Sequence, residues 1–79
     1  MISCGKKEPL AWELSDEFTR LYKGKQYEEA KEVGKNFLER YPDDERAANV
    51  QLQLASAYYR LKDFDRARKE YEKTIQKYP

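Results

Sequence analysis

Two stretches of this sequence share one pattern: residues 25–42, KQYEEAKEVGKNFLERYP, and residues 62–79, KDFDRARKEYEKTIQKYP. Each stretch has an aromatic residue, an acidic residue and a further charged residue, followed by an alanine twelve positions before a proline. The two copies begin 37 positions apart. A pattern repeated at this distance predicts that the chain contains the same structural unit twice.

Four segments have apolar residues every three or four positions, which is the spacing of an amphipathic helix. The apolar positions are Leu10, Leu14, Phe18 and Leu21; Tyr27, Ala30, Val33, Phe37 and Leu38; Ala47, Val50, Leu54, Tyr58 and Leu61; and Phe64, Ala67, Tyr71, Ile75 and Tyr78. No segment alternates with period two, so we expect an all-α protein without strands. Short connections make neighbouring helices antiparallel, and two amphipathic hairpins must stack to bury their faces.

Acidic residues stand where the third and fourth helices are expected to begin. Asp43 or Asp44 is expected to cap a third helix over residues 44–61, and Asp63 a fourth over residues 64–77.

The repeated hairpin resembles the tetratricopeptide repeat. The second unit, which starts at Ala48, has the expected residue types at Leu54, Ala55, Tyr58, Phe64, Ala67, Tyr71 and Pro79. The first unit, which starts at Ala11, matches at Leu21, Tyr27, Ala30 and Pro42. It departs at Phe18, where the family has a small residue, and at Gly34, where it has a large aromatic one. We expect Phe18 to fill the volume that Gly34 leaves.

The resemblance implies two stacked antiparallel helical hairpins, which form a segment of a right-handed α-solenoid. Residues 1–9 would be a tail, residues 10–42 the first hairpin and residues 43–79 the second. Three extra residues between the units are expected to extend the third helix backwards by nearly one turn. An unrelated four-helix bundle is the alternative, and two copies in phase disfavour it.

Proteins with this repeat are non-catalytic interaction modules that bind a peptide or a partner's helix in a concave groove. The repeat positions that line the groove are Trp12, Ser15, Thr19, Tyr22 and Lys23 in the first unit, and Asn49, Leu52, Ser56, Tyr59 and Arg60 in the second. Ser15, Thr19 and Ser56 stand where some members have Lys and Asn to hold a C-terminal carboxylate. The resemblance therefore disfavours that kind of tail binding.

Two groove positions carry the same chemistry in both units. Tyr22 and Tyr59 are equivalent, and so are Lys23 and Arg60. Aromatic residues and Arg are frequent interface anchors. The alternative is that both tyrosines pack on neighbouring helices while both cations are solvated. Trp12 has its own alternative, because it could cover the open end of the first hairpin.

Composition disfavours several other functions. Sixteen basic and fifteen acidic residues alternate along the chain, which indicates a solvated surface and no nucleic-acid partner. No apolar run reaches the roughly 20 residues of a membrane span. With one cysteine and no histidine, we expect no disulfide, no metal and no cofactor. Acidic pairs such as Glu28 and Glu29 fall at expected helix starts, where the helix dipole explains them, so no enzyme is expected.

The first nine residues, MISCGKKEP, resemble the junction at which a bacterial lipoprotein is lipidated on cysteine, here Cys4. Residues 41–64, YPDDERAANVQLQLASAYYRLKDF, resemble repeats of bacterial envelope lipoproteins that assemble outer-membrane proteins. This implies a lipid-anchored protein on the periplasmic side of the envelope. The hydrophobic segment that should precede the cysteine is not in the sequence. The alternative is a cytoplasmic protein in which Cys4 is an ordinary free thiol.

The outer face of the second hairpin is expected to remain partly apolar, because the sequence stops at the last landmark of the repeat. Such an end needs a cap or a neighbour. The domain would dimerise through this end, dock on a larger complex or be a fragment of a longer array. A structural accessory subunit that assembles through its ends, with the groove unused, is therefore the second functional hypothesis.

Overall fold

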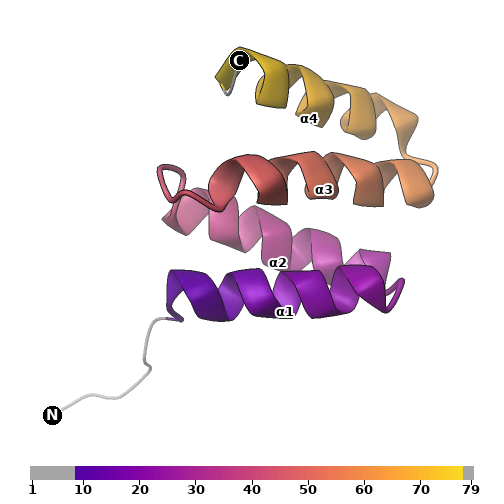
Figure 1. The fold of residues 1–79 in the computed structure, drawn as a ribbon. Helices are drawn as coiled ribbons and strands as arrows, with labels where there is room; N and C mark the ends of the chain where they lie inside the picture. Colours follow the sequence, from indigo (N-terminus) through magenta and orange to yellow (C-terminus); the bar gives the residue numbers. More distant parts are fainter. Residues whose placement is uncertain (1–8, 78–79) are drawn as a thin grey trace, which may run out of the picture.

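Helices occupy the four segments that the periodicity predicts. The computed structural model describes residues 9–77, with α1 (Ala11–Lys23), α2 (Tyr27–Arg40), α3 (Ala47–Arg60) and α4 (Phe64–Lys77) and no strand in this range. Consecutive helices run antiparallel, and α3 packs on both α2 and α4 (Figure 1). The predicted all-α fold of two stacked helical hairpins is confirmed.

The same turn joins the helices of both hairpins. Lys25 and Lys62 occupy equivalent positions and have positive φ angles of 62° and 65°. In each turn, the next residue donates its N–H to the carbonyl five positions earlier, at 2.9 Å. A left-handed residue followed by this long-range bond is the Schellman ending of a helix. It reverses the chain within a few residues and makes each hairpin antiparallel.

The core lies where the two hairpins meet. Its buried residues are Leu14, Phe18 and Leu21 of α1; Ala30 and Phe37 of α2; Ala47, Val50, Leu54 and Tyr58 of α3; and Ala67 of α4. The largest side chains without solvent contact are Phe18, Phe37 and Leu54. Helix α3 contributes four of these ten residues, more than any other helix, and α4 only one, so burial decreases toward the outer side of the second hairpin.

The expected compensation between Phe18 and Gly34 is confirmed. A Cβ atom added at Gly34 would lie 2.9 Å from Cε1 of Phe18 and 3.5 Å from Cδ1 of Leu54. The Phe18 ring is fully buried against the bare backbone of α2. The second hairpin has the reverse arrangement, with buried Ala55 on its first helix and Tyr71 on its second.

The predicted backward extension of the third helix is wrong. Residues 42–46 form turns, and α3 begins at Ala47. No side chain caps α3, and neither Asp43 nor Asp44 has the predicted role. Asp44 instead accepts a hydrogen bond from the backbone N–H of Arg46 at 2.8 Å, while its side chain pairs with the Arg46 guanidinium at 3.0 Å. This local bonding competes with helix formation, as Asp side chains commonly do.

Helix α4 is capped as predicted but less buried than predicted. Asp63 Oδ1 accepts a hydrogen bond from the Arg66 N–H at 3.4 Å, at the long end of the range for such a bond. Phe64 and Ile75 were expected to face inward, yet they are 54% and 70% exposed. The described part of the chain has no helix beyond α4 to cover them. Tyr78 and Pro79 lie outside the described residues.

Two contacts hold the start of α1. The Glu13 carboxylate accepts a hydrogen bond from the Leu10 backbone N–H at 2.8 Å, which fixes the first turn. The Tyr41 hydroxyl, at the end of α2, donates to the carbonyl of Pro9 at 2.6 Å. Pro9 is thereby attached beside the loop that connects the two hairpins.

Candidate functional site

Helices α1 and α3 lie side by side and carry all the residues that the repeat pattern assigns to the groove (Figure 1). Six of these residues are exposed: Trp12, Lys23, Asn49, Leu52, Tyr59 and Arg60. Four are half-buried: Ser15, Thr19, Tyr22 and Ser56. We call this set the α1–α3 surface.

Large apolar side chains are unusually open on this surface. Trp12 is 52% exposed, Leu52 45% and Tyr59 57%. The alternative for Trp12, that it covers the open end of the first hairpin, stays a prediction. Exposed aromatic and aliphatic side chains on neighbouring helices are the residue types that anchor a protein partner.

The two equivalent tyrosines have different environments. The Tyr22 ring centroid is 6.0 Å from that of Phe18 and 5.6 Å from that of Tyr27, and the side chain is half-buried. The packing interpretation therefore holds for Tyr22. Tyr59 makes an edge contact with Phe64 at 5.3 Å and remains mostly exposed. Of the two tyrosines, Tyr59 is therefore the one with an open aromatic face.

Charge on the α1–α3 surface is concentrated at one end. Lys23 and Arg60 close α1 and α3, and no ion pair joins either side chain to another residue between 9 and 77. Cations in a last helical turn interact favourably with the helix dipole. Both remain available to a partner's carboxylate. The Ser56 hydroxyl is already engaged, because it lies 3.1 Å from the Tyr71 hydroxyl.

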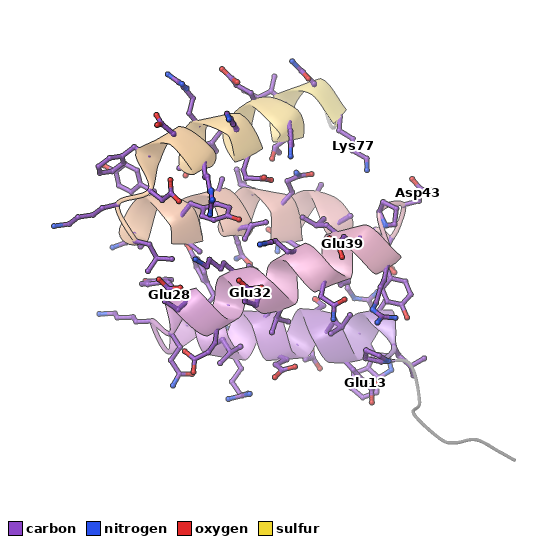
Figure 2. The ribbon with its side chains drawn as sticks, turned by 180° about the vertical axis from the view of Figure 1, so that it is seen from behind. Glu13, Glu28, Glu32, Glu39, Asp43 and Lys77 are labelled. Carbon is purple, nitrogen blue, oxygen red and sulfur yellow. The ribbon has the colours of Figure 1, made fainter. Side chains whose placement is uncertain are left out.

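The opposite side of the first hairpin carries paired charges of both signs. Figure 2 shows Glu28 and Glu32 one turn apart on α2, where they pair with Lys31 at 3.0 Å and Lys35 at 3.9 Å. The hydrogen bond that Lys31 donates to Glu28 is the main reason why the pKa of Lys31 is raised above its ordinary value. Both pairs join residues one helical turn apart and lie on the surface of α2, although the Lys31 side chain itself is half-buried.

Sequence reasoning missed one buried polar contact. Gln51 is 7% exposed and donates from Nε2 to the Glu70 carboxylate at 2.8 Å, which joins α3 to α4. The only signal was a glutamine in the apolar stripe of the third helix. This contact holds the second hairpin together and is not part of the α1–α3 surface.

Within residues 9–77 no helix is long and apolar enough to cross a membrane. The same part of the chain has no cluster of three or more His, Cys, Asp or Glu residues that could hold a metal ion. Cys4 lies outside the described residues. The α1–α3 surface is therefore the candidate site: it has exposed apolar side chains and two cations on neighbouring helices.

Repeated antiparallel hairpins with such a surface define a helical-repeat protein of the tetratricopeptide type. The family model of YfiO, an outer membrane lipoprotein, matches residues 11–79, and the chain belongs to this family. The predicted resemblance to repeats of bacterial envelope lipoproteins is thereby confirmed. No curated protein and no solved structure matches the chain. Membership associates the chain with the cell envelope and with protein complexes, and proteins of this repeat type are in general not enzymes.

Proposed function

We propose that this protein is a non-catalytic interaction module that binds a peptide or a partner's helix on its α1–α3 surface, within an envelope complex. The observation that carries the proposal is the exposure of Trp12, Leu52 and Tyr59 on neighbouring helices. Side chains that are about half exposed contribute less to the stability of the fold than buried ones do. Membership of a family of outer membrane lipoproteins supports the envelope context.

The shape of the surface suggests the chemistry of the ligand. Trp12 lies near the start of α1, and Lys23 and Arg60 lie at the ends of α1 and α3. A bound segment would place apolar residues against the aromatic side chains and an acidic group beside the two cations. Charge-assisted hydrogen bonds of this kind add orientation as well as affinity.

The test compares binding by two double variants. Trp12→Ala with Leu52→Ala removes anchors from the α1–α3 surface alone, whereas Tyr59 also borders the outer face of α4 and cannot separate the two. Glu29→Ala with Lys35→Ala, two exposed residues of α2, is the matched control. We expect envelope proteins that co-purify with the wild-type protein from native cells to be lost with the first variant only.

If the Trp12 and Leu52 variant keeps its circular dichroism spectrum, its thermal unfolding transition and its partners, the α1–α3 surface is unused. The protein would then be an accessory subunit that assembles through its ends. The exposed residues of α4 are the specific observation in favour of this second function.

We also propose that Cys4 carries a lipid that anchors the protein on the periplasmic side of the envelope. The support is the residue pattern around Cys4 and the lipoprotein family that matches residues 11–79. Mass spectrometry of the N-terminal peptide from native cells is the test. A diacylglyceryl group on Cys4, with residues 1–3 removed, is expected. An unmodified peptide that begins at Met1 or Ile2 would indicate a cytoplasmic protein.

A further inference from the structure

A groove runs along α3 between α2 and α4, which do not contact each other within the described residues. Figure 2 shows one labelled residue of each wall, Glu39 on α2 and Lys77 on α4, with α3 between them. Toward the C-terminal ends of α2 and α4 the groove opens into a hollow of about 400 Å³. We call it the amide hollow; its lining residues are Leu38, Gln51, Lys73, Gln76 and Lys77. None of them belongs to the α1–α3 surface.

Gln51, the residue that α3 contributes to the amide hollow, has unused hydrogen-bonding capacity. It is 7% exposed and donates one N–H of Nε2 to the Glu70 carboxylate at 2.8 Å. A glutamine side chain has a second N–H and a carbonyl oxygen that accepts. No described residue donates to this oxygen, yet no sealed side-chain N or O atom between residues 9 and 77 lacks a partner. The Gln51 oxygen is therefore open to the hollow.

The α4 wall of the amide hollow presents cations and keeps its carboxylate engaged. Lys73 donates to Glu70 at 3.4 Å while 63% of its own side chain stays exposed, whereas only 15% of the Glu70 side chain is exposed. One Glu70 oxygen accepts from Gln51 and the other from Lys73. Lys77 follows one turn later on α4. A ligand in the hollow thus meets ammonium groups before it meets Glu70.

These groups select a ligand that has both an anionic group and a hydrogen-bond donor. Inorganic phosphate would pair with Lys73 and Lys77 but has no N–H to offer the Gln51 oxygen. An extended peptide segment with Asp or Glu has both, because its backbone N–H groups are unbonded and its carboxylates pair with ammonium groups. An α-helix has not, since its backbone N–H groups are bonded internally. Leu38 adds an apolar contact for a neighbouring side chain.

The acidic residues of a second copy do not fit this description. The pairs at 16–17 and 28–29 lie inside α1 and α2, so their backbone is helical. The run at 43–45 is held in a turn in which Asp44 accepts a hydrogen bond from the Arg46 N–H at 2.8 Å. No acidic run among the described residues is therefore an extended segment.

A membrane headgroup that carries both an ammonium and a phosphate also fits less well. Gln51 lies at the bottom of the groove and is almost covered. Glu39, which is exposed in the adjoining part of the groove, would meet the phosphates of a bilayer before they reached Gln51. A single extended chain can enter the groove without this repulsion.

We propose that the amide hollow binds an extended acidic segment of a partner protein. The Gln51 side chain hydrogen-bonds the backbone of the segment, and Lys73 and Lys77 pair with its carboxylates. This site is separate from the α1–α3 surface and does not depend on the function of that surface.

The probe is the synthetic peptide acetyl-Ala-Val-Glu-Glu-Val-Ala-amide, in which valine favours an extended chain. It is titrated into the isotope-labelled full chain at physiological ionic strength and followed by NMR. Shifts are expected at the residues that line the amide hollow, including the Gln51 side-chain amide. Lys73→Gln with Lys77→Gln should weaken binding about tenfold. Lys25→Gln with Lys62→Gln, which removes the same charge from the two turns, is the matched control and should leave binding unchanged.

A second pair of measurements tests the backbone contact. Methylation of the backbone nitrogens of both glutamates removes the N–H groups that the Gln51 oxygen can accept, so this peptide should bind the wild-type chain more weakly. Gln51→Met keeps a side chain of similar length without the amide and should bind the two peptides equally. Circular dichroism establishes that this variant is folded, and the lysine variants test the proposal if it is not.

Any of four results would overturn the proposal. The residues of the amide hollow do not shift at any peptide concentration; the shifts fall at Lys23 and Arg60 on the α1–α3 surface; the two lysine double variants weaken binding equally; or a peptide with glutamine in place of glutamate binds as tightly. Vesicles that contain phosphatidylethanolamine are the comparison ligand. If they shift these residues and the peptide does not, the hollow binds a headgroup, which also contradicts a partner segment.

Discussion

The two hairpins of this protein are copies in backbone but opposites in packing. The first places a large ring, Phe18, on its first helix and no side chain, at Gly34, on its second. The second places Ala55 on its first helix and Tyr71 on its second. The space between the two helices is thus filled from the first helix in one hairpin and from the second helix in the other. At this pair of positions the two hairpins keep a similar total side-chain volume with different residues.

The hairpins also differ in how their outer surfaces end. Polar and acidic residues, among them Glu13 and Glu17, cover the first hairpin, whereas Phe64 and Ile75 leave the second apolar. A polar outer face is the property of a repeat that closes an array, and an apolar one is the property of a repeat that receives a neighbour. The outer face of the first hairpin is thus of the polar kind and that of the second of the apolar kind.

The largest expected effect tests the exchange of volume. Phe18→Ala should cost about 3–5 kcal/mol of unfolding free energy, because it leaves a cavity beside bare backbone. Gly34→Tyr should also destabilise, since a Cβ alone would lie 2.9 Å from the Phe18 ring. The double variant gives the first hairpin the arrangement of the second. Its loss of unfolding free energy in urea should be smaller than the sum of the two single losses by at least about 1 kcal/mol. Additive losses, or stabilisation by Gly34→Phe, would disprove the compensation.

The next effect tests the covered and uncovered faces. Leu38→Ala on α2 should lower the free energy of unfolding by about 1–2 kcal/mol, because Leu38 packs against the core. Ile75→Ala, at the equivalent position of α4, should stay within about 0.5 kcal/mol of wild type, because Ile75 is 70% exposed. Thermal unfolding of both variants gives the comparison, and equal losses would mean that α4 is covered in solution.

A smaller effect tests the shared turn. Lys25 and Lys62 adopt the left-handed conformation, which costs non-glycine residues energy. Each replacement by Gly should stabilise the protein by up to about 1 kcal/mol in denaturation experiments, and the two gains should be similar and additive. Lys35→Gly, in the middle of α2, is the control and should destabilise by about 1 kcal/mol. A gain at only one turn would show that the two turns are not equivalent.

The smallest effect concerns the loop between the hairpins. The Arg46 backbone N–H, assisted by the Arg46 guanidinium, lowers the pKa of Asp44 below its ordinary value of 3.8. Because the folded-state pKa is the lower one, the carboxylate stabilises the fold above pH 3.8 and loses this contribution as pH falls through the lowered value. Asp44→Asn should therefore make stability depend slightly less on pH in the acid range, as followed by circular dichroism. An unchanged pH dependence would contradict the role of the Asp44 carboxylate.

Much of this architecture follows from the sequence, and particular residues show where prediction ends. Helical spacing and the repeat landmarks locate four helices and the Phe18–Gly34 pair, because both depend on local periodicity and volume. They misplace the start of α3, because the Asp44 side chain accepts a hydrogen bond from the Arg46 N–H in the turn before the helix and does not cap the helix. They also assign Phe64 and Ile75 to the interior, because a stripe indicates which residues share a face but not whether a neighbour covers it.

The candidate site is predicted less completely than the fold. Repeat positions locate the α1–α3 surface but do not distinguish Tyr22, whose ring packs between Phe18 and Tyr27, from the open Tyr59. That difference depends on Phe18, whose equivalent in the second hairpin is Ala55. The repeat pattern treats Tyr22 and Tyr59 as equivalent, whereas their surroundings depend on residues elsewhere in each hairpin.

Native-state hydrogen exchange of the full chain tests the central claim most directly, that one hairpin is closed and the other open. The amides of α2, which is packed between α1 and α3, should exchange only through global unfolding. Those of α4, held by α3 alone, should exchange at least tenfold faster through local opening. Equal protection of α2 and α4 in the monomer would contradict the account, because it would mean that α4 needs no neighbour on its outer face.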